Sequence, residues 1–319
     1  MKKILIVGGA GYIGTRLSNE LSKKYNITVV DNFWFGDFID DSVIKLNKNL
    51  WTLTVDDLIG FDAVLFLGGL ANDPMTMFRP DLSLIENTAA PTYLAYLTKL
   101  AGIKKFICAS SCSVYGHTKN KILNESSEVK PSYVYGISKL QMESGIMILK
   151  DESFNPIIFR KGTVGGWSQK MRYDLVVNTM IKSALTTGQI IVNNPDLWRP
   201  LIDIRDVIQG YELAIEAESG ISGIYNISGT NLTIGDLGKT IHRELINKGI
   251  KVDLIINNIV DVRNYMVDTT KIELELNYKS KYTVVDSLNE IFEKIDFNGY
   301  DFTKDIYYNI ETFKRITKQ

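Results

Sequence analysis

KILIVGGAGYIG, residues 3–14, is the stretch that decides the fold, because an unbroken apolar run is followed at once by closely spaced glycines. Apolar residues without alternation are typical of a strand covered on both faces, as in a parallel sheet. The glycines let the backbone turn tightly and approach a pyrophosphate, which then lies on the amide end of the next helix. We therefore predict a dinucleotide cradle, formed by Gly8, Gly11, Tyr12, Ile13 and Gly14.

A second apolar strand, residues 27–30, is followed by Asp31 and Asn32. A carboxylate at this point accepts both hydroxyls of the adenine ribose and repels a 2′-phosphate, so the pattern favours NAD over NADP as the cofactor. The alternative is an ordinary glycine turn. The strand, the following helix and the acid together disfavour that alternative.

The composition bears on several classes of function. With 319 residues, 45% of them hydrophobic, the chain is long enough for one large core or two lobes. The net charge of −1 gives no general attraction to nucleic acid or to an anionic membrane, so neither is expected as a partner. Cysteine and histidine number 2 each, which disfavours a metal site and a histidine-based triad. Sparse cysteine usage also suits a cytoplasmic location.

Strand and helix patterns alternate along the first half of the chain. This rhythm predicts an α/β fold, a doubly wound parallel (Rossmann) sheet with a second, smaller α/β substrate lobe. We assign residues 1–165 to the NAD-binding domain, with a returning segment near 197–225, and residues 166–319 mostly to the substrate-binding lobe. The Lys- and Glu-rich tail beyond residue 290 is expected to be solvated surface. The expected helices include residues 12–24, 82–101, 133–150, 174–186, 206–218, 234–248 and 284–295.

Tyr135 and Lys139 are four residues apart, so on a helix both project from one face. A phenol ordinarily titrates near ~10, but an adjacent ammonium and a positive nicotinamide ring favour phenolate, a base for a hydroxyl proton. Lys139 is also placed to hold the nicotinamide ribose. Ser111 follows the strand predicted at residues 104–110, where its hydroxyl can donate to the same substrate oxygen. Surface positions for the Tyr and Lys are the alternative, which the cradle disfavours.

These motifs resemble those of extended short-chain dehydrogenases/reductases, specifically the NAD-dependent nucleotide-sugar epimerase/dehydratase family, over essentially the whole chain. The resemblance implies an enzyme that acts on a nucleotide-sugar substrate with NAD as its cofactor. The matching stretches are GGAGYIG at residues 8–14, SCSVYG at 111–116, YGISK at 135–139, WRPLIDIRD at 198–206 and DVRNY at 261–265.

By this resemblance Ser111, Tyr135 and Lys139 form the catalytic trio, while Arg199 and Arg263 clamp the substrate's diphosphate. Guanidinium forks suit phosphate oxygens and keep their charge, whereas arginines in surface salt bridges are the alternative. Asn178 is a weaker candidate for the same pocket, because an Asn on a helix is more often a solvated surface residue. The resemblance also implies cofactor contacts at Asn49, Leu50, Gly68, Gly69, Leu70 and Asn87, and substrate contacts at Ser111, Ser113 and Thr163.

Two departures from the family pattern carry information. Family dehydratases have acidic residues just after the catalytic Ser or Thr, whereas this chain has Cys112 and Ser113, which are poor proton donors at neutral pH. Dehydration is therefore disfavoured. The Asp that contacts adenine in the family is replaced by Asn49, and Asp56 and Asp57 are the alternatives for that contact.

The expected reaction is NAD-dependent oxidation of a ring hydroxyl of a nucleotide sugar, at C4, with Tyr135 as the base. Rotation of the 4-keto sugar and return of the hydride gives a 4-epimerase, whereas release of the ketone gives a 4-dehydrogenase. A reductase of a 4-keto nucleotide sugar, a dehydrogenase of an apolar alcohol and a non-catalytic NAD-binding module are the alternatives. Thr163 stands where many relatives place a substrate-binding Asn, which leaves the sugar and the nucleotide open.

A homodimer is also implied by the resemblance, through helices at residues 82–101 and 133–150. Apolar residues on these helices agree with that contact, although packing into the core explains them equally well. They are Tyr93, Leu94, Leu97, Met142, Ile146 and Leu149.

Overall fold

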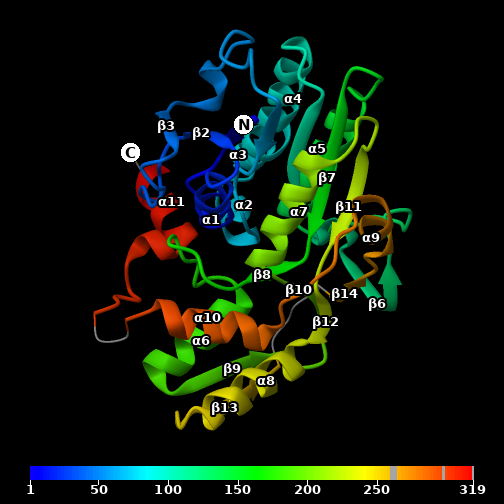
Figure 1. Ribbon diagram of the computed structural model, residues 1–319. Helices are drawn as coiled ribbons and strands as arrows, with labels where there is room; N and C mark the ends of the chain where they lie inside the picture. The colour runs from blue at the N-terminus through cyan, green and yellow to red at the C-terminus, as the bar shows by residue number, and fades with distance from the viewer. Residues whose placement is uncertain (259–263, 297–298, 318–319) are drawn as a thin grey trace.

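The computed structural model describes residues 1–258, 264–296 and 299–317 (Figure 1). Its centre is a 7-stranded sheet in the order β11-β7-β5-β4-β1-β2-β3, with every neighbouring pair parallel. The doubly wound parallel sheet predicted from the sequence is thus confirmed. The strands are β1 (Lys3–Val7), β2 (Asn26–Asp31), β3 (Ile44–Asn47), β4 (Ala63–Phe66), β5 (Lys105–Ser111), β7 (Asn155–Lys161) and β11 (Gly223–Ile227).

The sheet has its switch point beside β1. The chain first runs outward from β1 to β2 and β3, and then returns to add β4 on the other side of β1. Loops that follow β1 and β4 therefore leave in opposite directions and open a crevice at the carboxyl ends of the strands. This is the position in which open α/β sheets bind their ligands.

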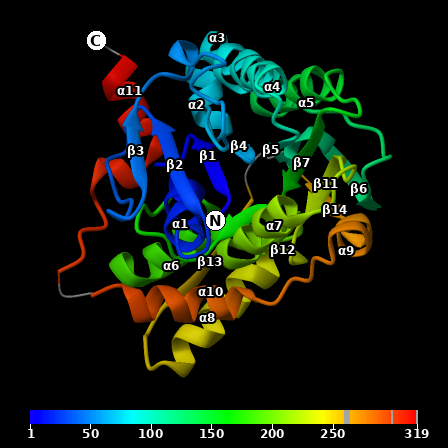
Figure 2. The same ribbon diagram turned by 45° about the horizontal axis from the view of Figure 1, so that its top comes forward.

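Helices cover both faces of the sheet. Figure 2 shows α4 (Ala90–Leu100) and α5 (Val134–Met147) above the strands, with α1 (Tyr12–Leu21) and α7 (Ile204–Glu216) below them. The first pair buries Leu94 and Met142 in one apolar core, and the second pair buries Leu17 and Tyr211 in another. Burial on both faces explains why β1 is an unbroken apolar run.

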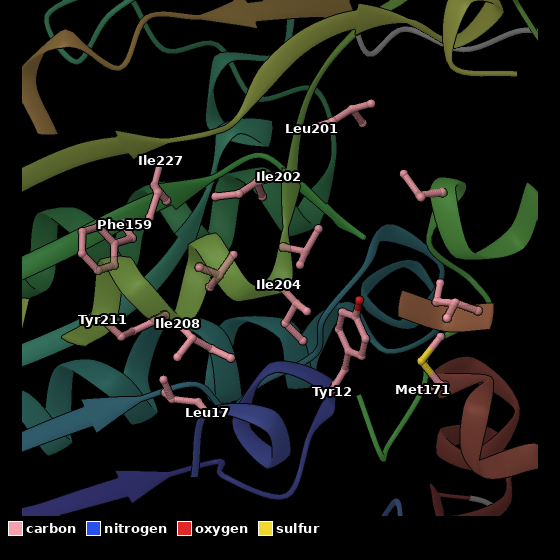
Figure 3. Packing of buried hydrophobic residues seen from close by; sticks show 14 of the residues in the cluster. Tyr12, Leu17, Phe159, Met171, Leu201, Ile202, Ile204, Ile208, Tyr211 and Ile227 are labelled. Carbon is pink, nitrogen blue, oxygen red and sulfur yellow. The ribbon is translucent and has the colours of Figure 1, made fainter. Parts of the chain in front are cut away.

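The second half of the chain builds smaller sheets and helices below the main sheet (Figure 1). Its core is continuous with that of the main sheet, since Tyr12 lies between Ile204 of α7 and Met171 in Figure 3. The helices are α6 (Val176–Thr187), α8 (Ile234–Asn247), α9 (Thr270–Leu276) and α10 (Val284–Lys294). The strands pair as β12-β10-β8 (Thr230–Thr233, Trp198–Asp203, Thr163–Gly165), β13-β9 (Asp253–Asn257, Gln189–Asn193) and β14-β6 (Asn264–Val267, His117–Leu123).

The helix expected at residues 82–101 is divided in the structure. A short helix α3 (Pro80–Leu84) leads into a π-helical turn η2 (Ile85–Ala89), and only then does the regular helix α4 begin. A further helix, α2 (Asp73–Phe78), was not predicted; Asn72 caps it by accepting a hydrogen bond from the Met75 amide. π-Turns and short capped helices have no distinct apolar period, so the sequence pattern merged or missed them.

The prediction that the tail beyond residue 290 is merely solvated was wrong for its last helix. Helix α11 (Asn309–Thr317) packs against α2, and Phe313 is completely buried there. Ile310 and Ile316 lie three residues on either side of Phe313 and pack into the same small apolar cluster. None of the helices in the described parts of the chain has the length and apolar character needed to span a membrane.

Candidate active site

A cavity of about 820 Å³ opens at the carboxyl ends of β1, β4, β5 and β7. It is lined by side chains and backbone from both halves of the chain. Most of the residues that the sequence analysis singled out share this cavity: Gly8, Gly11, Tyr12, Ile13, Gly14, Asp31, Asn32, Leu50, Gly68, Gly69, Leu70, Ser111, Ser113, Tyr135, Lys139, Thr163 and Arg199.

One end of the cavity is formed by the glycine-rich loop after β1. Gly8 has φ +82°, and a Cβ placed there would lie 2.2 Å from the backbone nitrogen of Gly68 in the loop after β4. Only glycine fits this conformation and this approach. At Gly11 an added Cβ would meet nothing nearer than the Gly8 oxygen at 3.9 Å, so the space beside the start of α1 is open. Such an open amide end suits a pyrophosphate.

Asp31 lies at the end of β2 and links the glycine-rich loop to the loop that follows β2. One carboxylate oxygen accepts a hydrogen bond from the Ala10 amide at 2.9 Å, and the other accepts from the Phe33 amide at 2.8 Å. Burial raises the pKa of Asp31, and the backbone donors act in the opposite direction. The carboxylate is therefore held in position beside the cradle, where ribose hydroxyls are expected.

Ser111, Tyr135 and Lys139 form one part of the cavity wall, the catalytic wall. Ser111 ends β5, and its hydroxyl accepts a hydrogen bond from the Ser113 amide at 3.2 Å. Tyr135 and Lys139 come from one face of α5, with the Lys139 ammonium 6.0 Å from the centre of the Tyr135 ring. Lys139 is buried and donates to the Ala109 carbonyl oxygen at 3.1 Å. The trio thus lines the same cavity as the glycine cradle.

The electrostatics of Tyr135 differ from the expectation. Burial raises its pKa to about 12, while the charge of Arg172 and a hydrogen bond with Ser111 act to lower it, and Asp73 acts to raise it. Arg172, rather than Lys139, is the cation with the largest effect on this phenol in the described structure. Burial also lowers the pKa of the Lys139 ammonium. A cofactor with a positive ring adds to the same stabilisation of phenolate.

Residues 4–228 match the model of the NAD dependent epimerase/dehydratase family, which is more than half of the chain. The chain belongs to this family. Its members depend on NAD, and the open cradle, the glycine contacts and Asp31 fit that cofactor. NAD is accordingly the cofactor of this epimerase/dehydratase-family chain.

Similar proteins include epimerases and a dehydratase. The UDP-glucose 4-epimerase of Yersinia enterocolitica is 25% identical over 346 residues, which cover 93% of this chain and 99% of that protein. The structure of UDP-glucuronic acid 4-epimerase from Bacillus cereus, in complex with UDP-glucuronic acid and NAD, matches with TM-score 0.80 and 23% identity, over 91% of this chain and 98% of that one. The hexosamine 5,6-dehydratase TunA, from tunicamycin biosynthesis, matches with TM-score 0.81 and 21% identity, over 93% and 100%. At such identities the structural matches establish the fold.

Three predicted contacts of this family member lie outside the cavity lining. Asn87 is completely buried and holds the loop after β4, accepting from the Leu70 amide at 2.7 Å and donating to the Leu70 oxygen at 3.0 Å. Asn49 caps the turn η1 (Leu50–Thr52), whereas Leu50 and Lys48 line the cavity near it. Neither Asp56 nor Asp57 lines the cavity.

The third contact outside the lining, Asn178, is a buried support rather than a solvated helix residue. Its amide donates to the Tyr12 hydroxyl at 3.3 Å and to the Arg172 carbonyl at 3.1 Å, and its oxygen accepts from the Gly166 amide at 3.1 Å. The Tyr12 hydroxyl in turn donates to the Gly166 oxygen at 2.8 Å. Asn178 therefore joins the cofactor end to the loop that carries Arg172.

Only one of the two arginines predicted to bind the diphosphate lies in the described part of the chain. Arg199, on β10, lines the cavity, donates to the Trp198 oxygen at 2.9 Å and lies 5.8 Å from the centre of the Tyr265 ring. Arg263 lies outside the described residues. Ser113 and Thr163 line the cavity near the catalytic wall, as the sequence analysis placed them. The Cys112 thiol instead donates to the Arg160 oxygen at 3.2 Å, and burial raises its pKa.

Besides Lys48, sequence reasoning missed two cations that line the cavity. Arg172 forms a two-point ion pair with Asp174, at 3.0 and 2.8 Å, and Asn72 donates to the same carboxylate at 2.6 Å. Lys161, the last residue of β7, is the other. The available signals were charged residues in an otherwise apolar strand end and in the segment before α6.

A buried network lies behind the catalytic wall. The Arg160 guanidinium pairs with the Glu143 carboxylate at 2.7 Å, and the Ser110 hydroxyl donates to Glu143 at 2.5 Å. Arg160 also donates to the Tyr115 hydroxyl at 3.0 Å. Glu143 lies one turn beyond Lys139 on α5, so the network fixes this helix against β5 and β7. Among the described residues, no group of three or more His, Cys, Asp or Glu side chains is placed to hold a metal ion.

Proposed function

We propose that the protein is an NAD-dependent nucleotide-sugar 4-epimerase. The observation that carries the proposal is that Ser111, Tyr135 and Lys139 line the same cavity as the glycine cradle of an NAD-dependent family. The curated relative from Yersinia enterocolitica is a UDP-glucose 4-epimerase, which makes a uridine nucleotide the first choice. Release of the 4-keto sugar, as a 4-dehydrogenase product, is the alternative outcome of the same first step.

The roles of the three residues follow from their chemistry. Tyr135, as phenolate, takes the proton of the sugar O4, and Ser111 donates a hydrogen bond to the same oxygen. Lys139 holds the ribose next to the reacting ring and favours the phenolate. NAD, when bound, supplies the hydride acceptor and donor. For epimerisation, Tyr135 then returns the proton to O4 after the sugar has presented its other face.

The remainder of the proposal concerns the substrate and the lobes. Arg199 and Arg263 bind the diphosphate, Ser113 and Thr163 contact the sugar, and residues 166–319 mostly bind the nucleotide sugar. Residues 1–165, with the segment near 197–225, bind NAD. The fork geometry of a guanidinium supports the first assignment, because it matches phosphate oxygens and retains its charge.

Dehydration is disfavoured because the positions after Ser111 hold Cys112 and Ser113. The Cys112 thiol is buried and bonded to the Arg160 oxygen, so it is a poor acid or base. Asp174 is engaged by Arg172 and Asn72. Asp73, whose charge acts on Tyr135, is the carboxyl that would serve a dehydratase, and the assay of products decides between the two reactions.

We further propose a homodimer formed through the helices between residues 82 and 150. Four of the apolar residues first considered, Leu94, Leu97, Met142 and Ile146, are buried in the core of the chain and are not available for this contact. Exposed apolar side chains on the same helices support the proposal instead: Leu84, Ile85, Tyr96, Leu100, Ile137 and Ile148. The free, buried thiols of Cys108 and Cys112 suit the proposed cytoplasmic location.

The test is to purify the protein, identify its retained cofactor and screen nucleotide sugars by mass spectrometry and proton NMR. A product of equal mass with inverted C4 is expected. Loss of two hydrogens would instead identify a dehydrogenase, and loss of water a dehydratase. A folded, NAD-bound protein that leaves every nucleotide sugar unchanged contradicts the proposal.

A further inference from the structure

Lys161 is a cation beside the reaction site that the proposed mechanism does not use. It ends β7, and its Cα is the register partner of Ser111 on β5 and of Ile227 on β11. Neighbouring parallel strands lie about 4.8 Å apart and register partners project from the same face. Lys161 therefore starts one strand away from the hydroxyl that donates to the sugar O4, and it lines the same cavity.

Four charged or titratable side chains surround Lys161, and they come from the different segments that pack against it. They are Lys139 on α5, Arg172 before α6, Cys108 on β5 and Tyr211 on α7, whose ring centre lies 6.0 Å from the ammonium. Lys139 donates to the Ala109 oxygen, and Arg172 is paired with Asp174. Within the described chain, Lys161 has no carboxylate partner. This part of the cavity wall thus has two cationic groups, Lys139 and Lys161, without an ion pair to a carboxylate of the described chain, and Lys139 is already bonded to the Ala109 oxygen.

We propose that Lys161 binds a carboxylate carried by the sugar, so that the substrate is a nucleotide-linked hexuronic acid. This inference rests on the proposed function, because it takes Ser111 as the donor to O4. In a hexuronic acid the carboxylate is attached to C5, the ring carbon next to C4, and Lys161 likewise lies on the strand next to that of Ser111.

The other anionic groups of the ligands already have partners. The cofactor pyrophosphate belongs to the open amide end of α1, and the substrate diphosphate to Arg199 on β10 under the proposed function. A neutral hydroxymethyl group in place of the carboxylate would give Lys161 no anionic partner, so burial would continue to disfavour its ammonium form. An anion on the sugar itself is what remains to compensate it.

The first experiment compares UDP-glucuronate with UDP-glucose, which differ only in this group. Wild-type enzyme is expected to have the higher kcat/KM for the acid. The ratio of acid to neutral kcat/KM is expected to fall about 10- to 100-fold in Lys161→Met, the range of a charge-assisted hydrogen bond. Lys161→Arg should keep the preference. Lys130→Met, in which an exposed ion pair with Glu128 is removed outside the cavity, is the matched control and should keep the wild-type ratio.

The second experiment measures proton uptake on binding and does not depend on turnover. Burial lowers the pKa of Lys161 to about 7, with Lys139 and Arg172 acting in the same direction. A bound carboxylate raises that pKa again, so at pH 8 the NAD-loaded protein should take up a proton with UDP-glucuronate. Calorimetry in buffers of different ionisation enthalpy should show this proton uptake when wild-type protein binds UDP-glucuronate. It should show no uptake when Lys161→Met binds UDP-glucuronate, and none when wild-type protein binds UDP-glucose.

The outcomes separate the two proposals. Equal or better turnover of UDP-glucose by wild-type enzyme, or an equal loss on both sugars in Lys161→Met, overturns the role of Lys161 while 4-epimerisation stands. Absence of turnover with either sugar counts against the proposed function, and the proton-uptake measurement then still decides whether Lys161 binds the carboxylate. A circular-dichroism melt of each variant verifies that it is folded.

Discussion

The two ends of the cavity are held in place by different forces. At the cofactor end, main-chain segments approach each other closely, as Gly8 does with Gly68, and backbone amides donate to Asp31. At the substrate end, charged side chains from β7, α5 and the segment before α6 meet, and ion pairs fix them. The first end leaves little freedom in residue type. The second end permits different charges on the same frame, which is where specificity among relatives is expected to lie.

Tyr135 belongs to the catalytic wall, and its replacement should separate the functions of the two ends most strongly. Tyr135→Phe removes the base but keeps the ring, so turnover is expected to fall by about 10²–10⁴-fold. NAD affinity should remain nearly unchanged, because the cradle is formed by other segments, the loops after β1 and β4. Steady-state kinetics and NAD titration check the two results. Unchanged turnover would contradict the assignment of Tyr135.

The pH profile of wild-type enzyme gives a supporting check on the same residue. The pKa of Tyr135 is raised to about 12 by burial, so the phenolate is the minor form at neutral pH. The kcat/KM should therefore rise with pH between about 6 and 9, with the cations near the phenol and the bound cofactor setting where the rise ends.

The second test of the comparison concerns the buried ion pair between Arg160 and Glu143. Arg160→Met leaves the buried Glu143 carboxylate without its cation, and the free energy of unfolding is expected to fall by about 3–5 kcal/mol. Arg160→Met combined with Glu143→Leu should recover much of this loss, since no uncompensated charge remains. Chemical denaturation measures both. Arg79→Met, which removes an exposed pair with Asp81, is the control and should change stability little. An equally small effect of Arg160→Met would show that the substrate end does not depend on its ion pairs.

Sequence reasoning succeeded where chemistry is encoded locally. The glycine spacing, the acid after β2 and the four-residue step from Tyr135 to Lys139 each lie within one short segment, and the structure brings all of them to one cavity. The parallel sheet also followed from local pattern, because strands buried on both faces are continuously apolar.

What the sequence did not reveal depends on contacts between distant segments. Arg172 acts on Tyr135 from 37 positions further along the chain, and Phe313 of α11 packs beside α2, far from it in sequence. Lys161 ends β7, and its exposure to the cavity depends on how β7 pairs with β5. No local period carries that information, so Arg172 and Lys161 could not be placed at the substrate end beforehand.

The third test concerns the acid at the cofactor end. Asp31→Asn removes the negative charge but keeps one oxygen to accept from the Ala10 amide, so the cradle should stay in place. A hydrogen bond with a charged partner contributes about 1.5–3 kcal/mol, which predicts NAD affinity lower by about 10- to 100-fold. NADP affinity should not fall, since the repulsion of its 2′-phosphate is removed. Titrations with both cofactors measure this, and Asp41→Asn, at an exposed position, is the control. Equal loss for both cofactors would contradict the ribose contact.

The last test is a pH-dependent difference in stability caused by Lys161. Its pKa in the folded protein, about 7, lies below the ordinary value of ~10.4 for an unfolded chain. Between these two pH values the unfolded chain binds a proton that the folded chain does not, so the contribution of Lys161 to the free energy of unfolding becomes more favourable as pH rises. Below pH 7 both forms bind the proton, and the unfavourable effect of the buried ammonium is complete.

Lys161→Met should therefore be most stable relative to wild type at pH 6.5, and its advantage should shrink by pH 9.5. Urea denaturation of both proteins without ligands, at pH 6.5, 8 and 9.5, measures the difference, in which the other titrating groups cancel. A difference that stays constant with pH would mean that water or another group already compensates the ammonium. A difference that shrinks means that the substrate end contains an uncompensated charge before its ligand binds. At the cofactor end, by contrast, backbone amides already donate hydrogen bonds to the Asp31 carboxylate.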